Sequence, residues 1–251
     1  MRIIDKVRLF CKVNWLRTVY FNYRYLPFYQ AKYLPILLYH PGTICGKGSY
    51  ILDVEQDKIK LGMLKLGVKN ENSILTKTGI CISNSGRVIF KGSGVIGNGC
   101  SLTIGKNGIL QMGKNFGITG DVSIHCYENI NIGDFFSSSW NVAIDDTDHH
   151  KLMDVEHNEE KAETKPITIG NNVWICQKVS ILKGSNLPDW TIVSSNSLVN
   201  KKYLTPPQPV RDRLFWDVSH RAEPLSRLHL SPSKGIYFFI LKFCFMLNNS
   251  S

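Results

Sequence analysis

Single aliphatic residues recur along this chain at intervals of six, set among Gly, Asn and Ser from about residue 80 onward. The longest unbroken series is Ile169, Ile175, Ile181, Leu187, Val193 and Val199. Shorter series precede it in competing registers: Phe90, Ile96 and Leu102; Ile104, Leu110 and Phe116; Met112, Ile118, Ile124 and Ile130. A lone alternating strand has a period of two. The period of six therefore predicts many short strands wound into a repeating solenoid.

In such a solenoid each repeat turns one aliphatic side chain toward a shared interior, so that successive turns bury a continuous column. Ile-Gly steps recur where a small residue would allow a sharp corner: Ile96-Gly97, Ile104-Gly105, Ile132-Gly133 and Ile169-Gly170. We predict an all-β core at residues 41–202. An acidic, highly charged loop at 145–166 interrupts the repeats and must project from them, and loops on rigid scaffolds often carry function.

The two ends of the chain differ from the repeats. Residues 1–40 form a basic aromatic segment that we predict to be helical, with seven Lys and Arg side chains against the single acid Asp5. This mixture suits either a membrane interface or a helical cap on the main domain. Residues 203–251 form a C-terminal extension whose apolar stretch at 235–247 predicts a helix too short to span a bilayer. That helix packs on the body, or contacts a membrane or another subunit.

Composition narrows the classes of function. The net charge of +10 over 251 residues favours anionic partners, but no nucleic-acid-binding motif accompanies it, so no nucleic-acid partner is expected. Seven cysteines without a CxxC pair indicate reduced thiols in a cytoplasm. The N-terminus lacks the pattern of a secretory signal, and no apolar stretch is long enough to cross a membrane.

The stretch PITIGNNVWICQKVSILKG, from Pro166 to Gly184, resembles the hexapeptide-repeat acetyltransferases. The likeness covers about residues 90–210 and includes galactoside- and maltose-acetyltransferase-like members and polysaccharide O-acetyltransferases. It implies a left-handed parallel β-helix with three strands per turn, a homotrimer, and acetyl-CoA as co-substrate in a groove between neighbouring coils.

The segment DTDHHKL, Asp146 to Leu152, resembles the family's loop that carries the general base, and His150 falls at that position. The adjacent His149 is the second candidate. A neutral imidazole, with an ordinary pKa of about 6.5, can take a proton from an alcohol near pH 7. Asp146 and Asp148 could orient the imidazole, or they could merely shape the turn.

The resemblance also assigns binding residues. It places along acetyl-CoA the residues Trp174, Cys176, Ser194, Ser195, Lys201 and Lys202, with the two lysines at the phosphates. Trp140 and Asn141 would line the acceptor pocket. Cys176 replaces a glycine, Ser194-Ser195 replace Gly-Ala, and the closing turn at 206–212 is distorted. These departures leave the details of CoA binding open.

The leading hypothesis is an O-acetyltransferase that moves an acetyl group from acetyl-CoA to a sugar hydroxyl of a cell-surface polysaccharide or its precursor. It would be cytoplasmic, with peripheral contact at the inner face of the membrane as an added hypothesis. No metal is expected.

The alternatives are a noncatalytic membrane-associated scaffold, a metal-dependent phosphoesterase suggested by Asp148-His149-His150, and a carbonic-anhydrase-like zinc enzyme. The zinc enzyme would draw its ligands from His125, His149, His150 and His157.

Overall fold

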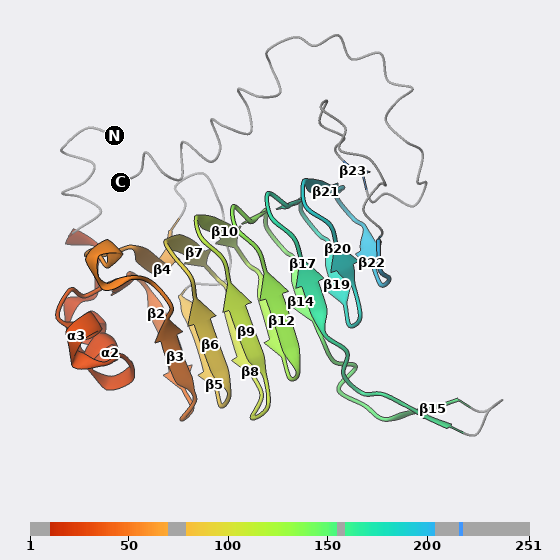
Figure 1. Cartoon of the computed structure of the whole chain (residues 1–251), viewed down its shortest axis with the longest axis horizontal. Helices are drawn as coiled ribbons and strands as arrows, with labels where there is room; N and C mark the ends of the chain where they lie inside the picture. Colours follow the sequence, from red (N-terminus) through yellow and green to blue (C-terminus); the bar gives the residue numbers. More distant parts are fainter. Residues whose placement is uncertain (1–10, 70–78, 155–158, 204–215, 218–251) are drawn as a thin grey trace, which may run out of the picture.

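Three sheets of parallel strands wind around one axis in the computed structural model, which describes residues 11–69, 79–154, 159–203 and 216–217 (Figure 1). The chain visits the sheets in turn, so each of the first six coils has one strand on each of three sides. The solenoid predicted from the six-residue period is therefore confirmed, and it is the parallel β-helix that the resemblance implies. The predicted C-terminal helix at 235–247 lies outside the described residues.

The strands are as follows. The eight-stranded sheet holds β1 (Ile36–Leu38), β4 (Leu64–Val68), β7 (Gly94–Asn98), β10 (Phe116–Gly120), β13 (Ser137–Ser138), β18 (Trp174–Ile175), β21 (Thr191–Val193) and β23 (Trp216–Asp217). The seven-stranded sheet holds β2 (Pro41–Cys45), β5 (Ile80–Asn84), β8 (Ser101–Ile104), β11 (Ser123–Cys126), β14 (Ala143–Asp145), β19 (Ser180–Leu182) and β22 (Leu198–Val199). The six-stranded sheet holds β3 (Ser49–Leu52), β6 (Arg87–Phe90), β9 (Ile109–Met112), β12 (Asn129–Ile132), β17 (Ile167–Ile169) and β20 (Asn186–Leu187).

The long aliphatic series forms the core of the last coils. All six of its members are at most 1% exposed. Ile169 pairs with Leu187, Ile175 with Val193, and Ile181 with Val199, so each member lies beside the member three places further along the series. Three hexapeptides therefore complete one turn here, as the resemblance to the hexapeptide-repeat family implies.

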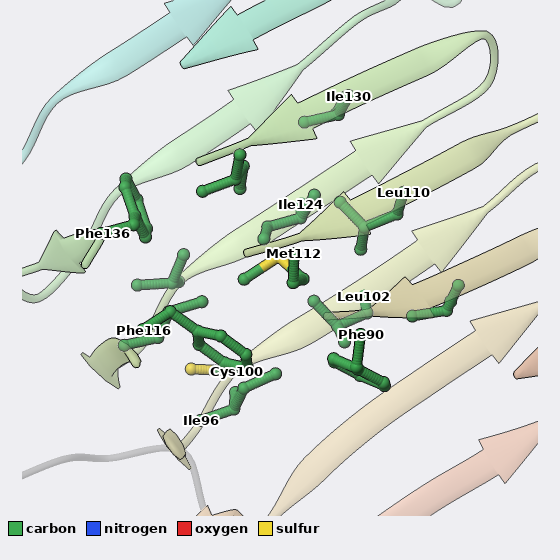
Figure 2. Close-up of a cluster of buried hydrophobic side chains, with 14 of the residues drawn as sticks. Phe90, Ile96, Cys100, Leu102, Leu110, Met112, Phe116, Ile124, Ile130 and Phe136 are labelled. Atoms are coloured by element: carbon green, nitrogen blue, oxygen red, sulfur yellow. The ribbon is translucent and has the colours of Figure 1, made fainter. Parts of the chain in front are cut away.

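The earlier coils are longer than three hexapeptides, which explains why several registers compete before residue 130. Leu102 pairs with Ile124, and Leu110 pairs with Ile130. Their longer strands alternate between partly exposed and buried positions and turn two side chains inward, as Leu102 and Ile104 do in β8. Figure 2 shows these inward side chains stacked from coil to coil.

The corners do not depend on glycine in the way that the Ile-Gly steps suggested. None of the four predicted glycines has a positive φ, and Gly97 lies inside β7 rather than at a corner. Gly133 is required for close packing, because a Cβ there would meet the carbonyl oxygen of Gly170 at 2.7 Å. Many corners instead place Asn in the left-handed region, as at Asn172 with φ 57°, a conformation that Asn tolerates better than most residues.

The first coil is covered by two helices, α2 (Trp15–Tyr25) and α3 (Phe28–Ala31), with a short 3-10 turn η1 (Gln56–Lys58) further along. The buried Asn22 side chain donates to the carbonyl of Ile36 at 2.7 Å and accepts from the N–H of the same residue at 3.2 Å. Thr18 Oγ1 accepts from Leu38 N at 3.0 Å. These side chains make hydrogen bonds to the backbone groups on the outer edge of β1, which would otherwise be open to pairing with another strand. Helices therefore lie within the predicted N-terminal segment, and they cap the solenoid.

Among the described residues, no helix is long and apolar enough to cross a membrane. The six described cysteines are free thiols. Both β1 and β23 lie in the eight-stranded sheet, so strands of the solenoid extend on either side of the predicted range 41–202.

We expect Ile144→Ala to destabilise the protein by about 2–5 kcal/mol, because Ile144 is fully buried between Ile124 and Ile181 and its truncation leaves a cavity. The same substitution at Ile51, which is 39% exposed on β3, should change stability by no more than about 0.5 kcal/mol. Urea unfolding at one protein concentration measures both. Similar losses in the two variants would contradict the stacked core.

Candidate functional site

The charged insertion leaves the solenoid directly after β14 and returns at β17. Its outer part is an antiparallel hairpin of β15 (Leu152–Asp154) and β16 (Glu159–Lys161), which projects from the coils at the end away from α2 and α3 (Figure 1). Thr147 and Thr164 form an antiparallel bridge below the hairpin. The histidines of DTDHHKL therefore lie between the solenoid wall and the projecting hairpin.

Asp146 fixes the root of this insertion. Its side chain is fully buried, and its carboxylate accepts hydrogen bonds from Tyr127 N at 2.7 Å and Glu128 N at 2.9 Å. Burial raises the pKa of Asp146, although these backbone donors act in the opposite direction. The carboxylate thus holds the turn of the preceding coil. This contact fits the turn-shaping alternative for Asp146 rather than the orientation of an imidazole.

Asp148 is engaged by a lysine of the next coil. Lys183 forms an ion pair with Asp148 and donates to the backbone carbonyls of Ala162 and Glu163. Both sides of the insertion are thereby tied to the end of β19, where Lys183 is largely buried with 15% of its side chain exposed. This contact makes Asp148 part of a clamp on the insertion, and its predicted role as a partner for an imidazole stays a prediction.

The two candidate histidines are both exposed to solvent but differ in their contacts. His149 has a φ of 58° and its N–H donates to Thr147 Oγ1 at 3.0 Å. Its ring lies edge-on to the rings of His125 and Tyr127, at centroid distances of 5.5 and 5.3 Å. The ring of His149 is thus partly engaged by its neighbours. His150 is likewise exposed, and the ring contacts of His149 are not shared by it among the described residues.

The structure adds a pair that the sequence pattern did not assign to the site. His125 Nδ1 lies 2.6 Å from Asp145 Oδ1, across neighbouring strands β11 and β14. The hydrogen bond to Asp145 raises the pKa of His125, against the effect of burial, which lowers it. With Nδ1 bonded to the carboxylate, the other ring nitrogen is left for acid–base chemistry, as in other His–Asp pairs.

The sequence pattern did not reveal this pair because His125 and Asp145 are separated by more than three hexapeptides, whereas the clearest repeat returns after three. The sequence nevertheless contains a sign of this pairing. Both residues occupy the third position of a strand in consecutive coils. That equivalence becomes visible only when the coil lengths are known.

The predicted binding residues gather at a different corner. Trp140, Asn141, Cys176, Ser194 and Ser195 lie in or beside the first corner, defined as residues 139–142, 176–179 and 194–197, between the eight- and seven-stranded sheets. Backbone hydrogen bonds link its coils, from Lys178 N to Trp140 O at 3.1 Å and from Asn196 N to Gln177 O at 3.1 Å. The structure therefore brings these five predicted residues together on three successive coils.

Lys201 and Lys202 are placed apart from that group, whereas Trp174 lies on the strand that leads into the first corner. Trp174 is half-buried on β18, in the eight-stranded sheet. The exposed lysines follow β22, at the second corner, defined as residues 146–154, 159–166, 183–185 and 200–202, between the seven- and six-stranded sheets. The ammonium of Lys201 lies 5.3 Å from the centre of the Tyr203 ring.

Within one chain, the histidines and most of the predicted binding residues thus lie at opposite ends of the strands of the seven-stranded sheet. The histidine insertion is at the second corner, and Trp140 with the serines is at the first. Among the described residues, no group of three His, Cys, Asp or Glu side chains could hold a metal ion. His157, one of the candidate zinc ligands, lies outside them.

Comparisons with known proteins support the predicted resemblance. The chain is 33% identical over 92 residues to the galactoside O-acetyltransferase of Escherichia coli (strain K12), a match that covers 37% of this chain and 45% of that protein. The matched part is thus less than half of that enzyme. No protein-family model matches the chain.

Two solved structures are also similar. The polySia-specific acetyltransferase NeuO is 17% identical, with a TM-score of 0.42, over 72% of this chain and 91% of that one. The polysialic acid O-acetyltransferase OatWY is 20% identical, with a TM-score of 0.36, over 76% of this chain and 98% of that one. The fold assignment rests on the strand pairing of the chain itself.

We expect Asp145→Asn to lower the pKa of His125, because the carboxylate that stabilises the imidazolium is replaced by a neutral amide. Because the pKa of His125 is higher in the folded protein, the His125–Asp145 pair contributes its full stabilisation of the fold at pH values below the unfolded pKa of about 6.5. That stabilisation is lost as the pH rises through the pKa of His125 in the folded protein. NMR titration of the imidazole protons measures the first effect. Asp148→Asn, which removes the partner of Lys183, should leave the His125 titration unchanged, and an equal shift there would contradict the pairing.

Lys183→Met should loosen the insertion while leaving the solenoid intact, because it removes the ion pair to Asp148 and two bonds to backbone carbonyls. Loss of such contacts predicts amide exchange about tenfold faster in the hairpin. Hydrogen exchange read by mass spectrometry measures this. Lys178→Met, at an exposed position of the first corner, is the matched control. Unchanged exchange in Lys183→Met would show that the lysine does not clamp the insertion.

Proposed function

We propose that this chain is an acetyl-CoA-dependent O-acetyltransferase that acts on a sugar hydroxyl, with His150 as general base. The observation that carries this proposal is the exposed His150, held on an insertion that is tied to the solenoid at its root through Asp146 and Lys183. A base must be both accessible and fixed in place to act on a bound acceptor. The sequence similarity to a galactoside O-acetyltransferase supports the class of reaction.

In the proposed reaction, the neutral imidazole of His150 removes the proton of the acceptor hydroxyl as its oxygen attacks the thioester carbonyl. A bond forms between that oxygen and the acetyl carbon, the carbon–sulfur bond breaks, and CoA leaves as the thiol after taking up the proton. The imidazole is thereby returned to its neutral form. The oxygen of the tetrahedral intermediate carries negative charge and needs a hydrogen-bond donor nearby.

The first corner has features that suit acetyl-CoA. Ser194 and Ser195 are small side chains that allow close approach to the backbone, and Lys178 is an exposed cation on the same corner. The indole N–H of Trp140 is buried without an acceptor among the described residues, and a buried donor of this kind normally has a partner. A ligand or a neighbouring subunit could supply that acceptor. We propose that the pantetheine arm follows this corner past Cys176 and Trp174. Because Lys201 and Lys202 lie at the second corner, we propose that they meet the phosphates of a CoA bound along the first corner of a neighbouring subunit.

A homotrimer is part of the same proposal. In one chain the histidines and the first corner lie at opposite ends of the strands of the seven-stranded sheet. The histidines alone, or the binding residues of the first corner alone, would therefore not make a complete site. Rotation of neighbouring subunits about a common axis would bring the second corner of one against the first corner of the next, and cyclic symmetry repeats such a contact around a closed ring. Each site would then be shared between two subunits.

We further infer that the acceptor is a unit of a cell-surface polysaccharide or its precursor, met on the cytoplasmic side of the membrane. The sequence similarity to an enzyme named for a galactoside acceptor supports a sugar as the acceptor. The side chains nearest the histidines suit such a ligand. Asp145, His125 and the exposed Tyr127 offer hydrogen-bonding groups and an aromatic face beside His149.

His150→Ala should lower the turnover of acetyl-CoA with a saccharide acceptor by about 10²- to 10⁴-fold, the usual contribution of a general base. Release of CoA thiol measures the rate. His40→Ala, an exposed histidine of the first coil, serves as the control and should remain active. If the His150→Ala variant were fully active and a separate His125→Ala variant were inactive, the general base would be assigned to His125 instead. Failure of the wild-type chain to bind CoA in calorimetry would favour the noncatalytic scaffold.

A further inference from the structure

The outer face of α2 is apolar, although its opposite face already packs on the first coil. Leu16, Val19, Tyr20 and Tyr23 recur at the spacing of one helix face, and they are 88%, 43%, 67% and 49% exposed. A surface helix of a globular protein ordinarily places charged and polar residues on its outer side. This helix therefore presents a second apolar face that nothing in the described chain covers.

The apolar surface continues from α2 onto α3. Phe28 is 73% exposed and Tyr29 is 49% exposed. The ring of Tyr23 lies 6.1 Å from that of Phe28, so the surface is continuous between the two helices. We name it the outer aromatic patch, and its members are Leu16, Val19, Tyr20, Tyr23, Phe28 and Tyr29. Contiguous exposed apolar surface of this kind marks an interaction site.

The charged side chains on the two helices that carry the patch are all positive, although Asp53 lines a pocket together with Pro27 and Tyr29 at one edge of it. Residues 11–35 contain Lys12, Arg17, Arg24 and Lys32, each exposed, and no Asp or Glu. Arg24 lies 5.8 Å from the centre of the Tyr25 ring, and Lys32 lies 5.0 Å from that of Tyr33. Cations and amphipathic aromatic rings thus alternate over the same surface, which is the composition found where proteins meet membrane headgroups.

We propose that the outer aromatic patch docks this end of the solenoid on the surface of an anionic lipid bilayer. The helix lies along the interface, with Leu16 and the aromatic rings at the level of the headgroups and the exposed Arg24 and Lys32 toward lipid phosphates. The guanidinium of Arg17 instead donates to the carbonyls of Pro41 and Gly42 in the first coil. An 11-residue helix is too short to span the hydrocarbon core. A second copy of the chain would suit the patch less well, because two surfaces that each carry an excess of positive charge repel one another.

This proposal does not depend on acetyl transfer, and its test needs no activity. The full-length protein is mixed with phosphatidylcholine–phosphatidylglycerol vesicles and with pure phosphatidylcholine vesicles, and bound protein is measured by flotation. We expect binding to the anionic vesicles that weakens at high salt, since salt screens the attraction to lipid phosphates. The double variant Leu16→Glu/Tyr20→Glu should bind at least about tenfold less, because two apolar side chains no longer enter the interface.

The matched control is Leu198→Glu, which adds an acid at a 45% exposed leucine near the other end of the solenoid and should bind like the wild type. Circular dichroism verifies that all variants keep the β-helix. Undiminished binding by the double variant would overturn the proposal and assign the membrane contact to another part of the chain. Absence of vesicle binding by the wild type would also overturn it. In that case, a change in sedimentation between wild type and double variant would assign the patch to contact between copies.

Discussion

The stacking of inward-facing aliphatic side chains is the interaction on which the rest of this molecule depends. Each coil contributes one or two such residues per side, and from β7 onward the parallel pairing of neighbouring coils places inward-facing residues above their counterparts in the previous turn. Because a slip by one residue would turn the buried set outward, the hydrophobic column also fixes the register of the outward positions. Polar side chains on the outer surface are therefore placed as accurately as the core is packed.

The candidate site follows from that register. His125 and Asp145 face outward from neighbouring strands and meet at 2.6 Å because Ile124 and Ile144 beneath them stack in the core. The insertion then departs from the same strand, with Asp146 buried against the turn of the coil before and Lys183 of the coil after it holding both of its sides. Even a long insertion thus has a root that is as well fixed as the solenoid.

The start of the solenoid is closed by a helix rather than by a further strand. At the start, Thr18 and Asn22 satisfy the open edge of β1, so that the helix replaces the strand that a further coil would supply. The same helix turns apolar and cationic side chains away from the coil, which gives the cap a second surface. The coil that bears the insertion stands four strand spacings along the axis from the first coil, or roughly 20 Å. Docking through the cap would leave the histidines well above the plane of the headgroups, within reach of a glycan that extends from it.

The sequence by itself indicated a solenoid of short strands, because a six-residue recurrence of aliphatic residues such as Ile169, Ile175 and Ile181 does not fit the period of a lone strand. The three strands per turn were implied by the resemblance to the hexapeptide-repeat family. The sequence also located the insertion, since a charged segment of that length cannot remain inside the repeat. Only the tertiary structure decided which polar groups meet. The length of a coil changes along the chain, so no fixed spacing could pair His125 with Asp145, or direct Asp148 to Lys183 rather than to an imidazole. These contacts depend on how many residues each corner takes up, and that number is settled by the packing of one coil on the next.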